Sequence, residues 1–369
     1  MDRKNYDVIV WGTGMVGQHC LRYVIPHPEL RLVGVKCYHE AKDGKDAADV
    51  AAGDFAPTGI KLTRDREAII NMKADIVLFA PFDPLSDPSV AGTPSSAWVP
   101  DLLDLLRSGK NVIASMLSIA HWRHLKNGEQ LHAALDAAAR EGNATLFVTG
   151  IDPGFIPDAL AYAACGVVSE VKAINTWEVL DYGPYPELPT IRSLGFGSRP
   201  EDLPAGSMDV IRTAWGGCPY LLGEAFGVRI DEVVASADVA VAKETFTSES
   251  GLKIAEGTIE AIAFRVSGLR DGTPVFTVNH VTRMRQEAGE QFYRIGHDGG
   301  YAIDIDSYPP VKAEFLFGLP GGTGASWSDA MVMTSSRLVN SIESVADAPA
   351  GWRIFTELKN LGGRYAFAD

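Results

Sequence analysis

The segment from Asp7 to Tyr23, DVIVWGTGMVGQHCLRY, constrains the fold more than any other part of the sequence. An apolar run at residues 8–11 leads into the glycine pattern GTGMVG at residues 12–17, after which apolar residues recur at helical spacing. This order predicts a strand, a tight turn and a helix. In dinucleotide-binding units the first glycine permits the turn, the second lets the backbone approach a pyrophosphate, and the third lets helix and strand pack closely.

Such a pattern alone is weak, because glycine-rich turns are common and a purely structural turn is the alternative. A second apolar run at residues 30–35 stands where the next strand of a βαβ unit belongs, roughly 20 residues beyond the last glycine. Together they predict a nucleotide site at the helix amino terminus, where free amides favour phosphate. The predicted cofactor-binding residues are Gly12, Thr13, Gly14, Met15, Val16 and Gly17, with Phe79, Ala80 and Pro81 at the end of a later strand.

The residues after the second strand bear on the choice of cofactor. NAD-selective sites usually carry Asp or Glu here, to bind the ribose 2′-hydroxyl. This chain instead carries Lys36, followed by His39, Lys42 and Lys45, which can attract a 2′-phosphate. We therefore predict NADP, with NAD possible. The alternative is that these lysines simply belong to a solvated loop.

Length and composition set the wider bounds. A chain of 369 residues is long for one domain and comfortable for two. It has no apolar run of the roughly 18 residues that a membrane span needs, and its start lacks a signal-peptide apolar region. Its net charge of −14 disfavours nucleic-acid and anionic-membrane partners. We expect a cytoplasmic protein. We expect no metal site either, since His121 and His124 lack companion ligands.

Patterning predicts two kinds of domain. Strands at residues 74–81, 111–114 and 145–149 alternate with helices at 99–107 and 121–140, which predicts an α/β Rossmann fold with a doubly wound parallel sheet. A helix at 156–165 precedes period-2 runs at 171–180, 261–268, 275–283, 301–305 and 311–316, with a hairpin signal at Asp271-Gly272. These runs predict antiparallel strands in a second, α+β domain. A helix at 329–345 is expected to return to the first domain.

The predicted domains are therefore residues 1–150 for the nucleotide, 151–327 for substrate binding and dimerisation, and 328–369 for the returning helix. The proline-rich loop at residues 81–100 is expected to act as a lid over the nicotinamide or to be a stiff surface excursion. The glycine-rich residues 318–324 lack the ending of a phosphate loop and are expected to form a hinge.

Several segments resemble a known family, which combines a dihydrodipicolinate reductase-type amino-terminal domain with a 2,4-diaminopentanoate dehydrogenase-type carboxyl-terminal domain and includes native amine dehydrogenases. The similar segments span almost the whole chain and are VIVWGTGMVG, LVGVKCYHEAKDGKDAADVA, SGKNVIAS, VTGIDPGFIPDAL, EVLDYGPYP, LGFGSRPED, GTIEAIAFRVSGLRDGTPV, NHVTRM and SRLVNSIESVADAPAG. The resemblance implies an NAD(P)-dependent oxidoreductase, usually dimeric, that holds its substrate between two domains.

One departure from that family concerns the substrate. In its amine-forming members a carboxylate follows soon after the GKNV strand and serves the amine or imine. Here the place is taken by Ser115-Met116-Leu117-Ser118, without an acid. A positively charged imine is stabilised by a nearby carboxylate, so the departure weakens the amine dehydrogenase interpretation specifically.

The leading hypothesis is hydride transfer between NADP(H) and a small carbonyl or imine/amine substrate. Candidate polarising or proton-transferring groups are Tyr182, Tyr185, Asp152 and His280, each of which can equally be structural. One rival is a lyase or isomerase on the same scaffold that does not consume the nucleotide. Another is a nucleotide-binding regulatory protein without turnover.

Overall fold

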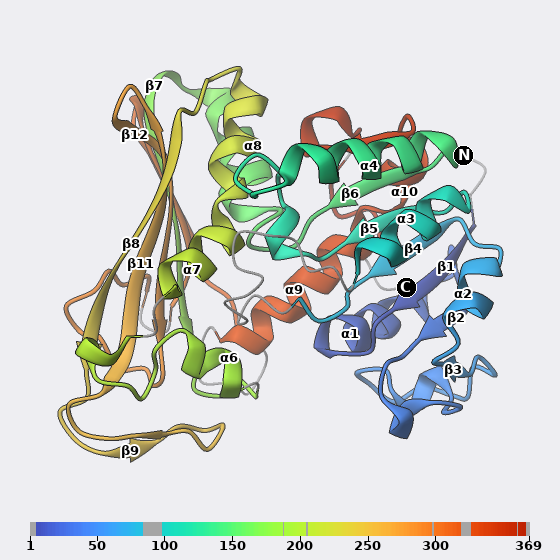
Figure 1. Cartoon of the computed structure of the whole chain (residues 1–369), viewed down its shortest axis with the longest axis horizontal. Coiled ribbons are helices and arrows are strands. Elements are labelled where there is room, and N and C mark those ends of the chain that lie inside the picture. The colour runs from blue at the N-terminus through green and yellow to red at the C-terminus, as the bar shows by residue number, and fades with distance from the viewer. Residues whose placement is uncertain are drawn as a thin grey trace.

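The computed structural model describes residues 5–83, 98–186, 188–203, 206–296, 299–318, 326–359 and 361–366. Within them, two large sheets organise the chain, one in each half of the molecule (Figure 1). The first has seven strands in the order β15-β6-β5-β4-β1-β2-β3, and the second has six in the order β14-β13-β7-β12-β11-β8. A small ribbon pairs β9 (Phe246–Thr247) with β10 (Lys253–Ile254).

Every pair in the first sheet is parallel, and the order from β3 to β6 is that of a dinucleotide-binding fold. The order changes direction between β1 and β4, which sets a switch point after those two strands. The strands are β1 (Tyr6–Trp11), β2 (Leu30–Lys36), β3 (Leu62–Thr63), β4 (Ile76–Phe79), β5 (Asn111–Ala114), β6 (Thr145–Val148) and β15 (Gly351–Arg353).

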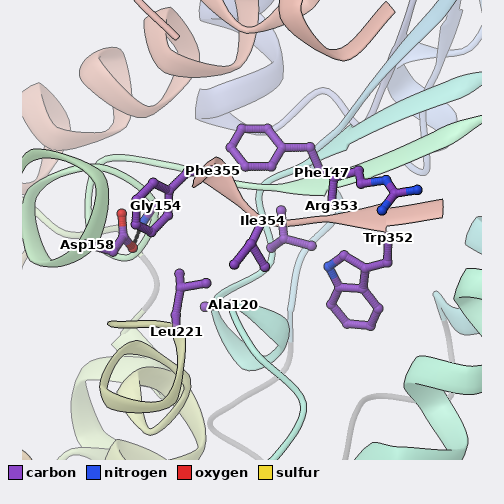
Figure 2. Close-up of a pocket in the computed structure, with 10 residues that line it drawn as sticks. Ala120, Phe147, Gly154, Asp158, Leu221, Trp352, Arg353, Ile354 and Phe355 are labelled. Atoms are coloured by element: carbon purple, nitrogen blue, oxygen red, sulfur yellow. Dashed lines mark hydrogen bonds between the residues drawn. The ribbon is translucent and has the colours of Figure 1, made fainter. Parts of the chain in front are cut away.

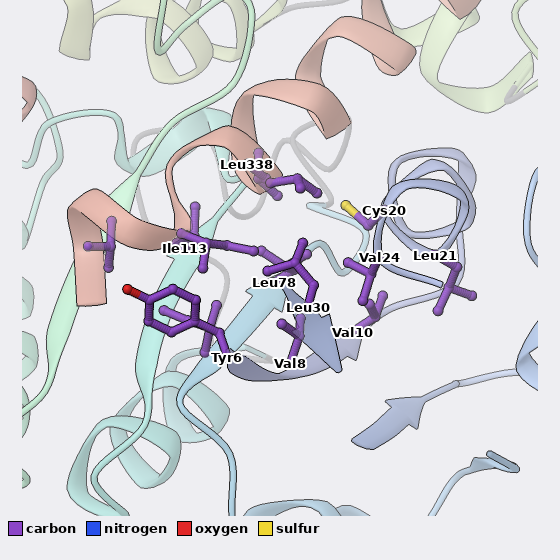
Figure 3. Close-up of a cluster of buried hydrophobic side chains, with 14 of the residues drawn as sticks. Tyr6, Val8, Val10, Cys20, Leu21, Val24, Leu30, Leu78, Ile113 and Leu338 are labelled. Carbon is purple, nitrogen blue, oxygen red and sulfur yellow. The ribbon is translucent and has the colours of Figure 1, made fainter. Parts of the chain in front are cut away.

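Helices cover both faces of this sheet. One face carries α1 (Met15–Val24), α9 (Trp327–Asn340) and α10 (Ile342–Ala346), and the other carries α2 (Arg66–Asn71), α3 (Val99–Arg107) and α4 (Gly128–Glu141). Figure 3 shows the first of these layers, where Cys20, Leu21 and Val24 of α1 lie over strand residues such as Val8 and Val10. Burial on both faces explains why these strands are almost uniformly apolar.

The second sheet contains β7 (Ser169–Asp181), β8 (Glu232–Val241), β11 (Ile259–Arg270), β12 (Thr273–Arg283), β13 (Gly300–Tyr308) and β14 (Val311–Phe315). Helices α6 (Leu188–Ser193), α7 (Ser207–Trp215) and α8 (Gly217–Phe226) lie on the side of this sheet that faces the first domain (Figure 1). The chain between the sheets forms the π-turn η4 (Ile156–Leu160), α5 (Ala161–Ala164) and η5 (Cys165–Val167). Other single turns are η1 (Glu40–Lys42), η2 (Ala47–Asp49), η3 (Leu117–Ile119), η6 (Pro200–Asp202) and η7 (Phe355–Glu357).

The predicted fold class is confirmed: a doubly wound parallel sheet is followed by a second domain with its own sheet. The hairpin at Asp271-Gly272 joins β11 to β12, with positive φ at both residues. Helix α9 packs on α1, as expected for a helix that returns to the first domain. Within the described residues, no helix is both long and apolar enough to cross a membrane.

The expectation that the second sheet is antiparallel is wrong in one respect. Strand β12 runs parallel to β7, with Phe276 opposite Ile174 and His280 opposite Glu178. Period-2 patterning identifies strands but does not fix which strands pair. Here β8 and β11 lie between β7 and β12 in the sequence, so no hairpin joins the parallel pair.

Three predicted helices are shorter or interrupted. The helix expected from residue 121 starts only at Gly128, because His121 and His124 are buried in contacts with α8 and α7 rather than in a helical turn. The helix expected at 156–165 begins as a π-turn, and that expected at 329–345 breaks at Ser341 between α9 and α10. Strands β8 and β15 and helices α7 and α8 were not predicted. Most of the lid or excursion (84–97) and of the hinge (319–324) lies outside the described residues.

Candidate active site

The carboxyl ends of four strands are level along one edge of the first sheet. Trp11 of β1 is paired with Phe79 of β4, Phe79 with Ala114 of β5, and Ala114 with Val148 of β6. Ligands in open α/β sheets bind outside this edge, near the switch point. The segments that continue from these strands therefore meet at one place.

The turn after β1 has the geometry of a phosphate site. Gly12 has φ of 103°, and an added Cβ would lie 2.3 Å from the Ala80 carbonyl oxygen. A Cβ on Gly17 would lie 2.0 Å from the Gly12 carbonyl oxygen, so this glycine keeps α1 against the strand. Gly14 differs, since no atom lies within 4 Å of its Cβ position. No side chain caps α1 and no acidic residue stands in its first turn, which leaves its amino terminus suited to an anion.

A cavity of about 910 Å³ runs from this turn into the space between the domains. This volume is within the range of cofactor and ligand sites. Nine predicted cofactor-binding residues line it: Gly12, Thr13, Gly14, Met15, Val16, His39, Lys42, Ala80 and Pro81. Two predicted catalytic residues, Asp152 and Tyr185, line it as well. Gly17, Lys36, Phe79, Tyr182 and His280 do not.

The end of the cavity nearest β2 is basic. Lys42 donates a hydrogen bond of 2.6 Å to the carbonyl of Thr13, which places its ammonium group against the glycine turn, and burial lowers its pKa. Tyr38 and His39 line the same region. Lys36 points elsewhere: its Nζ donates to the Cys37 carbonyl and lies 4.5 Å from the centre of the Tyr38 ring. Lys36 therefore packs against the ring of Tyr38 and does not line the cavity itself.

The opposite end holds a buried charged network that contains three of the four predicted catalytic residues. His280 Nε2 lies 3.4 Å from Asp152 Oδ2, and His280 Nδ1 lies 3.1 Å from Glu178 Oε1. The indole of Trp215 donates to Asp152 Oδ1 at 2.9 Å. Tyr182 and Tyr301 donate their hydroxyl groups to Glu178, at 3.2 and 2.9 Å. Asp152 alone of these groups lines the cavity.

Charge balance fixes the protonation of this network. Burial alone would lower the pKa of His280, but the carboxylates of Glu178 and Asp152 raise it to about 10. His280 is therefore a cation at neutral pH, with its ring stacked 4.6 Å from that of Phe264. Burial raises the pKa of Asp152, against the charge of His280. Asp152 is the member of this network that faces the cavity.

The two tyrosines have different positions. Tyr185 lines the cavity and packs edge-on against Trp327, with ring centres 4.3 Å apart. Tyr182 stacks behind it, with ring centres 5.7 Å apart. Burial and the neighbouring Glu178 raise the pKa of Tyr182 well above its ordinary value, so it stays protonated and donates to that carboxylate. Tyr185 can contact a ligand, whereas Tyr182 acts on one only through Glu178.

Behind the cavity wall lies a small void of about 10 Å³ (Figure 2). It shares Ala120, Val148, Gly154, Asp158 and Leu221 with the wall of the large cavity. Figure 2 shows the hydrogen bond between Gly154 and Asp158, in which the Gly154 amide donates to Asp158 Oδ2 at 2.8 Å. The void is too small for a substrate, and Asp158 holds the turn that follows Asp152.

Asp152, Glu178 and His280 also form a group of potential metal ligands, with ligand atoms within 4.8 Å of one another. A metal ion would require His280 to give up its proton and its position between the carboxylates. The absence of a metal site stays a prediction, and proton transfer is the role that we propose for this group.

Several residues of the site were not found from the sequence, namely Glu178, Tyr301, Tyr38, Trp327, Asp83 and Ser118. Glu178 had a usable signal, because it continues the alternation of Ile174 and Thr176 on the buried face of β7. A carboxylate on an apolar face indicates a charged partner inside the protein. Asp83 had no such sequence signal, because its partner Ser118 comes close to it only when β4 pairs with β5.

Known proteins resemble this chain over most of its length. Residues 155–362 match the model of the 2,4-diaminopentanoate dehydrogenase C-terminal domain. The chain belongs to this family. It is thereby an NAD(P)-dependent dehydrogenase, as the resemblance implied. The matched region continues beyond residue 327, past the predicted boundary of the second domain, through α9 and β15.

Individual relatives extend the similarity to the whole chain. The chain is 29% identical over 348 residues to an amine dehydrogenase from Streptomyces virginiae, covering 93% of each sequence. It shares its fold with an amine dehydrogenase from Mycobacterium smegmatis, with a TM-score of 0.74, 19% identity and 99% of both chains covered. A putative oxidoreductase from Magnetospirillum magnetotacticum matches at a TM-score of 0.50, with 15% identity over 93% of each chain.

Proposed function

We propose that this enzyme transfers hydride between NADP(H) and the carbon of a small imine or carbonyl, so that in the reverse direction it oxidises a small amine or alcohol. The observation that carries the proposal is the single cavity that joins the glycine turn to Asp152 and Tyr185. A nucleotide whose diphosphate lies at Gly14 has its other end directed toward those side chains.

NADP is the proposed cofactor because the ribose end of the cavity is basic. Lys42 and His39 line it, and no Asp or Glu occupies the place after β2 where NAD-selective folds carry one. We leave Lys36 out of the 2′-phosphate site, since it does not line the cavity.

The chemistry adds one hydride and one proton across C=N or C=O, or removes both. The bound nicotinamide supplies or accepts the hydride. Asp152 is the proposed group that holds and returns the proton, since it faces the cavity and burial raises its pKa. His280 and Trp215 orient its two oxygens, and Glu178 with Tyr182 and Tyr301 holds His280 in place. His280 and Tyr182 are thus positioning residues.

The cavity favours a compact, largely apolar substrate. Phe82, Met116, Leu117, Trp327 and Met331 line it beside the charged groups. Among the described lining residues, the acidic ones are Asp83, Asp152 and Asp158, which makes this end attractive to a cation. This charge, with the amine dehydrogenase relatives, supports an amine over an alcohol as the reduced substrate.

The proposal includes a homodimer in the cytoplasm, with no nucleic-acid or membrane partner. Helices α7 and α8 cover one side of the six-stranded sheet (Figure 1), and several of its strands carry exposed apolar side chains, including Tyr308 at 71% exposure. Light scattering coupled to gel filtration tests the dimer.

Turnover is tested by following NADPH absorbance with cyclohexanone or 2-butanone, each with and without ammonium chloride. We expect NADPH to be consumed with a ketone, and faster when ammonium is present. Product formed without loss of NADPH would favour the lyase or isomerase. Binding of NADPH without any product across a wider ketone panel would favour the regulatory protein.

A further inference from the structure

The loop after β4 brings a carboxylate to the end of β5. Asp83 stands four residues beyond Phe79, and Ser118 stands four residues beyond Ala114, its strand partner. Asp83 Oδ2 accepts hydrogen bonds from the Ser118 hydroxyl at 2.7 Å and from the Ser118 amide at 3.3 Å. Two neighbouring strands therefore fix one carboxyl group at the cavity edge.

Asp83 lines the cavity without a cationic partner. In the described part of the chain no Lys, Arg or His pairs with it, whereas Asp152 has His280. The basic groups that line the cavity, Lys42 and His39, stand with Tyr38 at the ribose end. Burial raises the pKa of Asp83, against the hydrogen bonds from Ser118. A carboxylate in this setting gains stability from any cation that enters.

We propose that Asp83, oriented by Ser118, binds the positively charged nitrogen of the substrate as an ammonium or iminium ion. The inference rests on the proposed function and names the residue that selects nitrogen over oxygen. It also resolves the missing acid at residues 115–118, because Ser118 holds a carboxylate that comes from the neighbouring strand. A carboxylate here stabilises the charged C=N⁺ that accepts hydride, and it gains little from a neutral C=O.

A purely structural role makes a different prediction. Asp83 accepts the amide of Ser118 within the turn η3, and such a bond can simply hold that turn. If so, loss of the charge would lower stability and affect all substrates alike. A role in nitrogen binding instead lowers only reactions of charged nitrogen.

The first experiment compares Asp83→Asn with wild type, because Asn keeps the size and still accepts from Ser118. The probe is cyclohexylamine oxidation with NADP⁺, beside cyclohexanol oxidation and NADPH binding. We expect kcat/KM for the amine to fall about 10²-fold or more, while cyclohexanol turnover and the Kd for NADPH change less than about threefold. Asp181→Asn is the matched control, since Asp181 is a half-buried carboxylate that accepts a backbone amide outside the cavity.

The second experiment tests Ser118 as a positioning residue. Ser118→Ala should raise KM for cyclohexylamine several-fold and move the acid limb of its pH profile, and Ser118→Thr should restore both. The structural alternative predicts no movement of that limb. Calorimetric titration of the NADP⁺ complex with cyclohexylammonium gives a readout apart from turnover: we expect saturable binding in wild type and loss of it in Asp83→Asn.

The outcomes separate the two proposals. Equal losses for amine and alcohol in Asp83→Asn, or unchanged amine kinetics, would overturn the role of Asp83 and leave the oxidoreductase standing. Unchanged binding of cyclohexylammonium in that variant would overturn it as well. Failure of the proposed function has a separate signature, which is wild-type enzyme that binds NADPH but transfers hydride to no ketone and from no amine or alcohol.

Discussion

The glycine turn at one end of the cavity is one continuous stretch of backbone, whereas the opposite end is built from charged side chains of several distant segments. At the first, Gly12, Gly14 and Gly17 set the position of a strand, a turn and a helix that follow one another in sequence. At the second, Asp152 comes from the segment after β6, Glu178 from β7 and His280 from β12. The first end is shaped by sterics and the second by electrostatics, so substitutions should affect them differently.

Removing the charge of Asp152 should have the largest effect. In Asp152→Asn the proton carrier is lost and His280 keeps only one carboxylate, so we expect kcat to fall about 10³-fold. The Kd for NADPH should change by less than about threefold, because Asp152 lies at the far end of the cavity. Steady-state kinetics and fluorescence titration measure the two quantities. If kcat and the affinity for NADPH fell by comparable factors, the two ends of the cavity would not have separate roles.

The buried network should make stability depend on pH. The pKa of His280 is raised from 6.5 to about 10 in the folded protein, so its contribution is complete below pH 6.5 and is lost as the pH rises through 10. Asp152 and Glu178 are the charges that face it, so they repel each other once it is neutral. We expect wild type to exceed His280→Gln by roughly 2–4 kcal/mol in unfolding free energy at pH 7. Urea unfolding at several pH values tests this, and a difference that stays constant up to pH 10.5 would contradict it.

The glycine turn should separate stability from binding. Gly17→Ala places a Cβ 2.0 Å from a backbone oxygen, so we expect a loss of about 2 kcal/mol or more in stability. Gly14→Ala meets no protein atom within 4 Å and should leave Tm almost unchanged. Its methyl group faces the expected diphosphate and should raise the Kd for NADPH roughly 30-fold. If Gly14→Ala still bound NADPH tightly, the result would show that the nucleotide does not bind at this turn.

The basic region should show the smallest effect, and only for one cofactor. Lys42→Ala removes a charge that lines the cavity, so the Kd for NADPH should rise about tenfold and that for NADH less than twofold. Lys36→Ala is the matched control, because Lys36 does not line the cavity, and it should leave the ratio of the two Kd values unchanged. A change in that ratio for Lys36 but not for Lys42 would reverse the assignment.

This contrast also explains what the sequence could predict. The parallel sheet, the glycine turn and the hairpin at Asp271-Gly272 depend on short-range patterns, and the structure has them where expected. The parallel pairing of β7 with β12 and the contacts of Asp83 with Ser118 depend on segments that come together only in the fold. Asp152 and His280 were candidates by residue type, yet their connection through Glu178 required the register of two strands. The basic residues after β2 were recognised as a group, but which of them faces the cavity depends on side-chain direction.

In the proposed reaction, hydride passes directly from a nucleotide at the glycine turn to a substrate carbon at the acidic end of the cavity. Incubation with NADPH deuterated at C4 of the nicotinamide, cyclohexanone and ammonium chloride, followed by mass spectrometry, tests this directly. We predict cyclohexylamine that carries one deuterium on the carbon bonded to nitrogen, when the deuterium occupies the transferred face. Amine without deuterium from cofactor labelled on either face would contradict the account.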